Sequence, residues 1–557
     1  MELTRCLLGK EINKMLKDLV NIPRNIVISV GATGCLNVLY NEAIKYNKRN
    51  LLYTFPVDEI DMISGEHIKK LEILIEEIIK ERYKDIDSII IYETCTDLLI
   101  GSNFKLLIKK IVDKYGIIVK VLERGPISKR KILPRERLEK LIVELQEDLK
   151  SQNKKINNFN IKAEDSKGKV QHFIPPIVSD YSGACSALYS PKILKIVISP
   201  GGCRTPVIYD EIRNIDNSLV YCTKMGEMEV LLGEEGELVK KIEEVIKNEK
   251  IEMIALIRTV IPSFTGMDIE NIGEILEKKY KIPTIVLNSN SFENYYSGIS
   301  TTFLTLGKKF LAKENIKKRE RSINIIGYTP LTFGKIEKLS PLFDEIKQLK
   351  LNIEAIFSHE ISLEKIKNSI NANLNIVLSH EGIPLAEFMK KEFDIPYLII
   401  NLVGKYGMEQ TKIQLSEFFN LQVEKKIYFE VLQEDQRKVL IISSPFMAKN
   451  LAESLKKDFN IPNTKPVSFL RKNGKLRKIY KDLDNKIELI DEEEKLLKLI
   501  EEYNPDILIG DLLYKEMLQK EKVFIPLTHS GYSTRLNMKQ EYYYCGEEGY
   551  KYFKSFL

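Results

Sequence analysis

The sequence predicts an α/β protein made of several consecutive Rossmann-like domains, with parallel sheets flanked by helices. Short runs rich in Ile and Val alternate with amphipathic stretches of helical period along the whole chain. The chain has 557 residues, of which 44% are hydrophobic, so it is long enough for roughly three to five domains of about 100 to 200 residues each. Two glycine-rich turns that end in a cysteine follow two of the predicted strands, as is typical of strand-to-helix junctions in such domains.

The predicted strands fall into four groups. The first two groups comprise residues 26–30, 88–92 and 117–122, then 193–199, 253–258 and 284–288. The last two comprise residues 323–327, 353–357, 376–379 and 397–401, then 439–443, 507–510 and 523–527. Stretches dense in polar residues separate the groups, as expected of linkers. We therefore predict α/β domains over residues 1–150, 169–312, 322–425 and 437–557, with a linker over 151–168.

Composition excludes several classes of function. The net charge is +6, from 85 basic and 79 acidic residues, and the basic residues form no clustered patch of the kind that binds nucleic acid. No segment has the roughly 18 uninterrupted apolar residues of a membrane span, and the N-terminus lacks the apolar core of a signal peptide. Seven cysteines, an odd number in a long chain, do not suggest a disulfide framework. We expect a cytoplasmic protein with neither nucleic acid nor a membrane as a partner.

The first two groups of strands carry matching motifs. Gly-Ala-Thr-Gly-Cys ends at Cys35, and Pro-Gly-Gly-Cys ends at Cys203, each directly after a predicted strand. An acidic helix start follows each cysteine at the same distance, at Glu59 and at Glu227. This fixed offset predicts one supersecondary unit used twice. A thiol kept at the same place in both copies suggests a metal ligand.

The two turns do not match the usual nucleotide-binding fingerprints. The sequence contains no G-x-x-x-x-G-K-[ST] motif, so a P-loop ATPase is not expected. A cysteine at a strand-to-helix turn instead lies near free backbone N–H groups and the positive end of the helix dipole, which stabilise a thiolate. Such a thiolate suits an iron–sulfur cluster.

The order of these cysteine motifs resembles component 1 of nitrogenase and its relatives, which include dark-operative protochlorophyllide reductase and the nitrogenase cofactor-assembly scaffold. The first unit matches through Cys6, through Gly34 and Cys35, and through a Glu-Thr-Cys-Thr-Asp-Leu-Leu-Ile-Gly-Ser segment that contains Cys95. The second unit matches through Gly-Ala-Cys185 and Cys203, with Val260 where a third cysteine is expected. Later segments around residues 377–404 and 525–550 extend the resemblance to nearly the whole chain.

The resemblance implies a cluster held between the two related units, either [4Fe–4S] or larger and similar to the P-cluster. The implied metal ligands are Cys6, Cys35, Cys95, Cys185 and Cys203, and Gly34 and Gly202 are the implied cofactor-binding glycines. Buried structural thiols are the alternative for these cysteines. Cys222 could be a further ligand or a core residue, and Cys545 is better interpreted as packing.

The same resemblance places the substrate site in the second half of the chain. The candidate catalytic residues there are His380, His529 and Arg535. His380 follows a predicted strand, where α/β sheets place ligand-binding residues, and His529 and Arg535 could position an anionic substrate group. In the dinitrogen-reducing relatives a cysteine that holds the molybdenum–iron cofactor stands where this chain has Ser379, so we expect no such cofactor in that binding mode. His67 is expected at the surface.

We therefore expect an iron–sulfur oxidoreductase that takes low-potential electrons from a separate ATP-dependent iron protein to reduce an unidentified substrate. The alternatives are a scaffold that assembles a metallocluster without turnover, and a ligand-binding protein without redox chemistry. Relatives are assemblies of unlike subunits, so the fusion of two cluster domains either replaces the unlike partner or leaves a homodimer, which we favour.

Overall fold

The computed structural model confirms an α/β fold with four sheets flanked by helices. Three sheets are fully parallel, and the other has one antiparallel edge strand. None of the helices in the described ranges is both long and apolar enough to span a membrane. The structure describes residues 3–5, 14–123, 134–151, 174, 177–200, 219–226, 229–230, 235–313, 316–422, 433–470, 476, 487–533 and 542–557.

Unit one is the sheet β3-β2-β4-β5 with its helices. Its strands, all parallel, are β2 (Asn25–Gly31), β3 (Leu52–Pro56), β4 (Ser88–Glu93) and β5 (Ile118–Glu123). Both central strands, β2 and β4, are buried along their whole length, as expected where helices cover both faces of a parallel sheet. The helices are α1 (Lys14–Val20), α2 (Thr33–Lys45), η1 (Arg49–Leu51), α3 (Glu59–Ser64), α4 (Glu66–Arg82), α5 (Cys95–Ile100), α6 (Lys105–Tyr115) and α7 (Pro134–Lys150).

Unit two is the sheet β1-β7-β6-β8-β9 with its helices. Its strands are β1 (Leu3–Arg5), β6 (Ile193–Ile198), β7 (Val220–Thr223), β8 (Met253–Arg258) and β9 (Thr284–Leu287). Strand β1 pairs antiparallel with β7, whereas the sequence assigns the first residues of the chain to the first domain. The helices are α8 (Asp180–Ala187), α12 (Glu235–Asn248), α13 (Val260–Thr265), α14 (Ile269–Tyr280) and α15 (Tyr295–Phe310).

Unit three is the sheet β11-β10-β12-β13 with its helices. Its strands are β10 (Ser322–Ile326), β11 (Asn352–Ile356), β12 (Leu374–Val377) and β13 (Tyr397–Ile399). Its helices are α16 (Pro330–Phe333), η2 (Ile336–Leu339), α17 (Ser340–Gln348), α18 (Leu363–Asn368), η3 (Ser369–Asn371), η4 (His380–Gly382), α19 (Ile383–Phe393) and α20 (Gly404–Phe418).

Unit four is the sheet β16-β15-β14-β17-β18 with its helices. Its parallel strands are β14 (Val439–Ile442), β15 (Thr464–Phe469), β16 (Glu488–Ile490), β17 (Ile507–Gly510) and β18 (Val523–Pro526). Its helices are α21 (Pro445–Asp458), α23 (Glu493–Tyr503), η5 (Leu512–Met517), α24 (Ser530–Ser533) and α25 (Gly546–Lys554).

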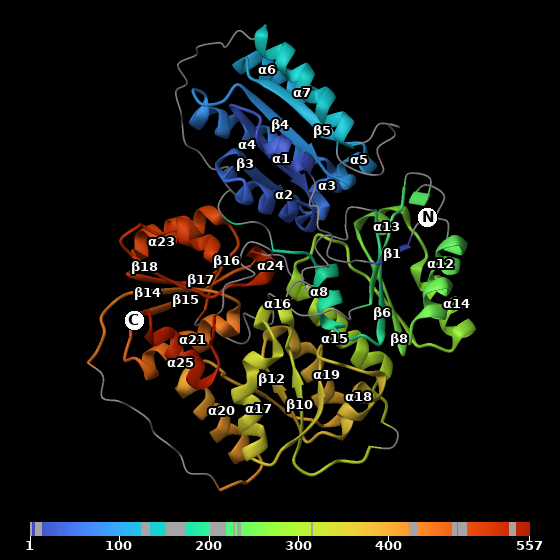
Figure 1. Cartoon of the computed structure of the whole chain (residues 1–557), viewed down its shortest axis with the longest axis vertical. Helices are drawn as coiled ribbons and strands as arrows, with labels where there is room; N and C mark the ends of the chain where they lie inside the picture. The colour runs from blue at the N-terminus through green and yellow to red at the C-terminus, as the bar shows by residue number, and fades with distance from the viewer. Residues whose placement is uncertain are drawn as a thin grey trace.

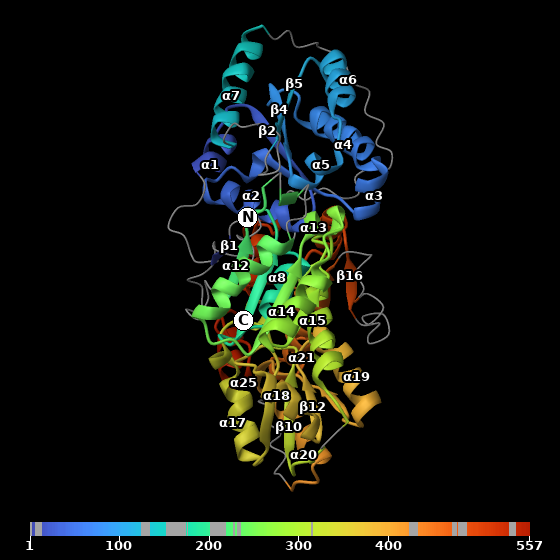
Figure 2. The ribbon, with the colours of Figure 1, turned by 90° about the vertical axis from the view of Figure 1, so that its right-hand side faces the viewer.

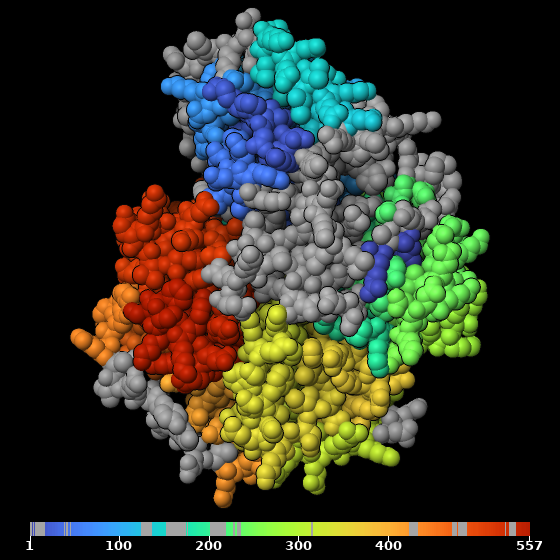
Figure 3. All heavy atoms as spheres, viewed as in Figure 1, coloured from blue at the N-terminus to red at the C-terminus, as the bar shows by residue number. Residues whose placement is uncertain are grey.

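Unit one forms one end of the molecule, and unit three lies at the opposite end (Figures 1 and 2). Units two and four lie between them on either side, and the space-filling view shows the blue atoms of unit one resting above the red atoms of unit four (Figure 3). Helices α8, α16 and α24 meet near the centre, where units two, three and four come together (Figure 1). Residues that follow the strands of several sheets are therefore close to one another at the centre.

The apolar interior continues across the borders between units. One cluster joins Ile28 and Ile91 of unit one to Leu256 of unit two. A second cluster joins Phe303 of unit two to residues of units three and four, such as Phe446. Because buried apolar area stabilises a contact by about 25 cal/mol per Å², these shared cores hold the units in a fixed arrangement.

Units one and two share a detail at the end of one central strand. Strand β4 leads through Thr94 into the six-residue α5, and β8 leads through Thr259 into the six-residue α13. Both helices end at a glycine in the left-handed conformation, and α5 and α13 contact each other. Cys95 and Val260 are the first residues of these helices, so the two residues occupy corresponding positions. The duplication itself stays a prediction, because many α/β proteins share this strand order.

Candidate functional site

Cys35 and Cys95 lie at the same edge of the first sheet. Cys35 is in the first turn of α2, directly after β2, and Cys95 begins α5, directly after the neighbouring strand β4. Both side chains are half-buried and pack against the core that units one and two share. The carboxyl edge of the sheet therefore brings together two of the predicted thiol ligands, each at a helix start that favours a thiolate.

Gly34 permits a close contact between units one and two. A Cβ atom at Gly34 would lie 2.5 Å from Oγ of Ser179 and 3.3 Å from the ring of Tyr181. Because Ser179 is the residue just before α8, the start of α2 abuts the start of α8. The absence of a side chain at Gly34 thus has a packing role here, beside the cofactor-binding role that the sequence predicts.

Cys185 is placed differently from the two cysteines of unit one. It is 3% exposed and belongs to the cluster that joins units two, three and four. Within the described ranges, no three or more His, Cys, Asp and Glu side chains form a group that could hold a metal ion. The described part of the chain therefore does not gather Cys35, Cys95 and Cys185 at one point. Cys6, Cys203, Gly202 and Arg535 lie outside the described residues.

The other two described cysteines pack in cores, as the sequence suggests for Cys545. Cys222 lies on β7 and is 2% exposed. Cys545 is equally buried, its Sγ lies 3.8 Å from Sδ of Met408, and burial raises the pKa of its thiol to about 12. A thiol with such a pKa is neutral and is a poor metal ligand.

One predicted surface residue is buried. The sequence predicts His67 at the surface, but it is 1% exposed on α4. Its Nε2 lies 3.2 Å from Oδ1 of Asp97, on α5, and its Nδ1 lies 3.1 Å from the carbonyl oxygen of Asp61. The prediction was wrong because these oxygen partners compensate the ring for its burial. His67 supports the helix that begins at Cys95.

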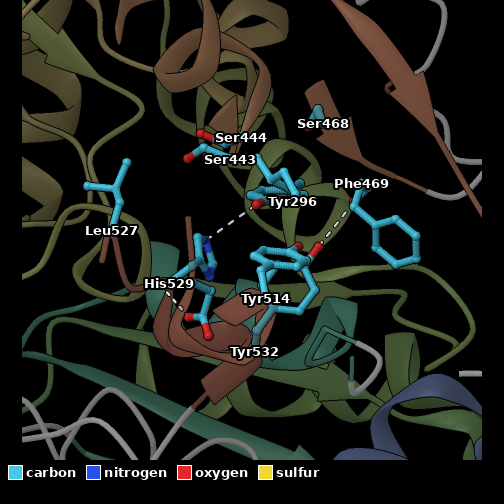
Figure 4. Close-up of a pocket in the computed structure, with 11 residues that line it drawn as sticks. Tyr296, Ser443, Ser444, Ser468, Phe469, Tyr514, Leu527, His529 and Tyr532 are labelled. Carbon is cyan, nitrogen blue, oxygen red and sulfur yellow. Dashed lines mark hydrogen bonds between the residues drawn. The ribbon is translucent and has the colours of Figure 1, made fainter. Parts of the chain in front are cut away.

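A small pocket lies at the carboxyl ends of the strands of unit four. The last residues of β15 and residues that follow β14, β17 and β18 line it, together with Tyr296 of α15. Ligands commonly bind at this edge of an α/β sheet, where the strand order reverses, here between β14 and β17. The lining residues are Tyr296, Ile442, Ser443, Ser444, Ser468, Phe469, Asp511, Tyr514, Leu527, His529 and Tyr532 (Figure 4).

Backbone hydrogen bonds fix the ring of His529. The backbone N–H of His529 donates to Oδ2 of Asp511 at 2.9 Å, and the backbone N–H of Gly531 donates to Nδ1 of the ring at 3.1 Å. Because Nδ1 accepts a hydrogen bond, the proton of the neutral imidazole must be on Nε2. That Nε2 lies 3.3 Å from Oη of Tyr296 and 3.4 Å from Oγ1 of Thr332. His529 therefore presents an N–H donor toward Tyr296 in the pocket wall.

His380 and Glu381 form a buried pair behind Tyr296. The His380 ring is fully buried, with its centroid 5.0 Å from that of Tyr296, and its Nδ1 lies 3.4 Å from Oε2 of Glu381. Burial, assisted by nearby His529, lowers the pKa of His380 well below its ordinary value. Burial raises the pKa of Glu381 to about 7. The pair is therefore neutral in mildly acidic solution and is not an ion pair.

Glu381 predicts a pH dependence of stability. Its carboxyl pKa rises from 4.5 to about 7 on folding, so the folded chain binds this proton more tightly than the unfolded chain does. The stability contributed by the protonated group is complete below the unfolded pKa and is lost as the pH rises through the folded pKa. Between about pH 5 and about pH 8, we expect wild-type protein to lose about 2 kcal/mol of unfolding free energy relative to Glu381→Gln, as measured by urea unfolding.

Asp180 offers an internal control for this comparison. Burial raises its pKa to about 7 as well, but it titrates in both proteins, so its contribution cancels from the difference. If the difference in unfolding free energy between wild type and Glu381→Gln stays constant over this pH range, Glu381 titrates near its ordinary value.

Aromatic rings fill the space around the pocket. The Tyr296 ring lies between those of His380 and His529, and the ring of Tyr532 packs on the other side of His529 at 5.6 Å. Figure 4 shows the rings of Tyr296, Tyr514, Tyr532 and His529 gathered around the same space. The pocket has room for about one water molecule in this arrangement. Only a small molecule fits unless the rings move.

Ser379 does not face this pocket as a ligand. Its hydroxyl donates to the carbonyl oxygen of Gly327 at 2.8 Å, and the side chain is 2% exposed. A Cβ at Gly327, where φ is +96°, would lie 2.7 Å from the same hydroxyl oxygen. Ser379 therefore holds the ends of β10 and β12 together.

Sequence reasoning identified His380 and His529 but missed three polar residues beside them. Asp511 follows β17 directly, and a carboxylate at the carboxyl end of a strand is a signal that could have revealed it. Tyr296 and Glu381 carry no comparable signal. They gain their position only where units two, three and four meet.

Comparison with known proteins identifies one family. The family described as nitrogenase component 1 type oxidoreductase matches residues 181–551, which is more than half of the chain and includes most of units two, three and four. A solved structure named Nitrogenase Cp1 at pH 5 is similar in fold, with a TM-score of 0.54 and 18% sequence identity, over 72% of this chain and 90% of that chain.

Three curated proteins illustrate the range of relatives. The nitrogenase molybdenum-iron protein alpha chain of Methanosarcina barkeri is 25% identical over 48% of this chain and 52% of that protein. The nitrogenase iron-molybdenum cofactor biosynthesis protein NifE of Clostridium pasteurianum is 25% identical over 39% and 47%. A light-independent protochlorophyllide reductase polypeptide of Heliobacterium modesticaldum is 24% identical over 32% and 35%. The chain thus spans about half the length, or less, of the curated relatives it matches.

Proposed function

The chain belongs to the nitrogenase component 1 type oxidoreductase family, and on this premise we propose that it is an iron–sulfur oxidoreductase. In this proposal a separate ATP-dependent iron protein supplies low-potential electrons, which pass through a cluster held by unit one and unit two. The substrate binds in the pocket beside His529. His380, His529 and Arg535 are the proposed catalytic residues.

One contact carries this proposal. Asn37 lies two residues beyond Cys35 on α2, and its side-chain amide donates to the backbone carbonyl oxygen of Tyr532 at 3.4 Å. Tyr532 lines the pocket. A single helix of unit one therefore carries a predicted cluster ligand and contacts the wall of the proposed substrate site, so electrons have only a short protein path to cross.

Cys35 and Cys95 fit an iron–sulfur cluster as two of its ligands. They share one sheet edge, each lies in the first turn of a helix, and each keeps some exposure, as a metal-binding thiol requires. We propose Cys6 and Cys203 as further ligands with Gly202 beside them. Cys185 is the least favoured of the five predicted ligands, because it lies in a different core. A bound cluster supplies one-electron transfer.

The residues of the pocket would then handle protons and exclude water. The rings of Tyr296, Tyr514 and Tyr532 leave little free space, which limits competition from solvent. His529 holds its proton on Nε2, 3.3 Å from Oη of Tyr296, so it can donate a hydrogen bond to that oxygen and leave the phenol proton free to be donated to a substrate. The pocket size favours a small substrate molecule.

Iron and acid-labile sulfide analysis of anaerobically purified protein tests the proposal. We expect about four or more irons per chain, an equal amount of sulfide, and an EPR signal after dithionite reduction. Protein that holds no iron after reconstitution would overturn the redox function and favour the ligand-binding alternative.

A scaffold function has one supporting observation, the similarity to the cofactor biosynthesis protein NifE. The two functions differ in what happens to the metal and to ATP. Cluster transfer to an acceptor protein, without ATP hydrolysis by an added iron protein, would favour the scaffold. Substrate-dependent ATP hydrolysis with the cluster retained would favour the oxidoreductase.

A further inference from the structure

The pocket beside His529 contains three hydroxyl groups that make no hydrogen bond within the described part of the protein. Ser444 follows β14, Ser468 lies near the end of β15, and Tyr514 lies on η5, which follows β17. Each is less than a tenth exposed, and all three line the pocket (Figure 4). Among the residues that the structure describes, none is hydrogen-bonded to any of these three hydroxyl oxygens.

Unbonded hydroxyl groups are rare in the interior of a protein. Nearly all buried polar groups have a hydrogen-bond partner, because burial without one costs stability. Three such groups around one pocket therefore indicate a partner that enters the pocket from outside.

The absence of a side chain at Gly510 lets Tyr514 reach this pocket. A Cβ at Gly510, the last residue of β17, would lie 3.0 Å from Cδ2 of Tyr514 and 2.9 Å from the carbonyl oxygen of Ile442. The ring of Tyr514 can therefore lie against the end of the sheet. Burial raises the pKa of Tyr514 well above its ordinary value, so the phenol keeps its proton and can donate it in a hydrogen bond.

The start of α21 adds further donors beside Ser444. The helix begins at Pro445, which has no backbone N–H, and the side chain of Ser444 does not cap the helix. The N–H groups of Phe446 and Met447, in the first turn, have no acceptor within the helix. Because the positive end of the helix dipole lies here, an acceptor atom is favoured at this side of the pocket.

The charges around the pocket exclude an anion as that acceptor. No Lys or Arg is among the described residues that line the pocket, but the carboxyl group of Asp511 is. Asp511 accepts hydrogen bonds from the backbone N–H groups of Leu513 and His529 and from the hydroxyl of Ser533, as an ionised carboxylate does. A buried anion would meet this carboxylate without a cation to compensate its charge.

We propose that Ser444, Ser468 and Tyr514 bind the carbonyl oxygen of an uncharged substrate group, a ketone, an aldehyde or an amide. This inference rests on the proposed function, because it names the chemical group that the substrate brings to the pocket. A carbonyl oxygen is about as large as the one water molecule for which the pocket has room. It accepts more than one hydrogen bond and carries no net charge, so it matches both the donors and the carboxylate around it.

Formamide and formate test the proposal as a matched pair of probes. They have nearly the same size and shape, but formamide presents an uncharged carbonyl oxygen whereas formate is an anion. The full-length protein is labelled with ¹⁵N-histidine, and His529→Gln assigns the His529 signals among those of five histidines. We expect formamide to shift the His529 ring signals to a saturable limit and formate to leave them unchanged. The ring of His67, in unit one, is the internal reference.

Ser468→Ala and Tyr514→Phe each remove one proposed donor. We expect each to weaken formamide binding about threefold to tenfold, the usual effect of one lost hydrogen bond. Because neither hydroxyl is bonded to a described residue of the protein, the urea midpoint of each variant should equal or exceed that of wild type. The two variants test the same site separately, in case one of them does not fold.

Tyr328→Phe is the matched control. The Tyr328 hydroxyl is also buried, but it donates to the carbonyl oxygen of Gly334 at 2.9 Å, outside the pocket. This variant should bind formamide as wild type does. Its urea midpoint should fall, because a buried carbonyl oxygen loses its donor.

Each other outcome overturns the proposal. Formate binding as tight as formamide binding would mean that the pocket takes an anion. If neither probe shifts the His529 signals, the three hydroxyls bond only to water. Formamide binding that is unchanged in both variants, or midpoints that fall as in Tyr328→Phe, would mean that the hydroxyls are engaged within the protein. The probes need no cluster and iron content is measured separately, so failure of this inference and failure of the proposed function can be told apart.

Discussion

Gly298→Ala is expected to destabilise the chain by about 3 kcal/mol or more, because it overpacks a contact between two backbones. A Cβ at Gly298 of α15 would lie 1.8 Å from the carbonyl oxygen of Asp180 on α8. The contact is reciprocal, since a Cβ at Gly183 of α8 would lie 2.0 Å from the carbonyl oxygen of Tyr295 on α15. A backbone carbonyl cannot rotate away as a flexible side chain can, so the two helices must separate.

Gly236→Ala is the control for this prediction. Gly236 lies in the first turn of α12, and a Cβ there would meet no atom within 4 Å. Alanine should stabilise that helix by up to about 1 kcal/mol, since glycine costs about this much in helices. Urea unfolding of both variants measures the contrast. Equal stability of Gly298→Ala and wild type would show that α8 and α15 are not as close as described.

Separation of α8 and α15 would also disturb the pocket. Helix α8 carries Ser186 and α15 carries Tyr295 and Tyr296, so the Gly183–Gly298 crossing sets the distance between the hydrogen-bonded hydroxyls of Ser186 and Tyr295. The same crossing positions α8 against α2 of unit one through Ser179. Two glycines without chemical function of their own thus fix how the cysteine-bearing unit and the pocket are placed.

The sequence predicted the central strands well because their signal is local. Every predicted strand overlaps a strand of the structure, and central strands such as β4 and β8 are continuous runs of buried apolar residues. Among the described strands it missed β1, β3, β7, β15 and β16, each of which has at most four residues or contains a proline. β1 and β16 have three residues each, and the middle of β15 contains Pro466, which normally argues against a strand.

Pro466 is tolerated because of the way β15 is paired. Its position is matched with Ile441 of β14, whereas the pairing with β16 on the other side begins only at Val467. A residue without a backbone N–H therefore costs no ladder bond with β16. The tolerance of Pro466 depends on where the pairing with β16 begins, and no sequence pattern near Pro466 reveals this.

The residues of the candidate site also fall into two groups, those that the sequence reveals and those whose position depends on how the units pack. Cys35 was found because a cysteine at a strand-to-helix turn is a sequence pattern, and His380 because it follows a predicted strand. Cys95 and His529 were found because their segments resemble those of the family. The position of Tyr296 beside the two histidines depends on α15 of unit two reaching η4 of unit three and His529 of unit four. Contacts among three separate sheets produce no recognisable residue spacing in the sequence, so they could not be predicted from it.

Cys35→Ala and Cys95→Ala are expected to lower the iron content of the purified protein at least about tenfold, because even residues that only support a metal ligand cost that much when replaced. Both thiols lie at helix starts on one sheet edge and remain partly exposed. They are therefore placed to ionise and to reach a cluster. Loss of one thiolate leaves an iron atom open to solvent and destabilises the cluster as a whole.

Cys545→Ala is the matched control, because it also removes one thiol. The pKa of Cys545 is raised to about 12 by burial, so its thiol stays protonated and should not hold iron. Iron, acid-labile sulfide and the EPR spectrum of the reduced state should match wild type in this variant and be lost in the other two. Full iron content in Cys35→Ala or Cys95→Ala would remove that thiol from the ligand set. Full content in both would mean that the sheet edge of unit one does not hold the cluster, and that any iron belongs to the remaining cysteines.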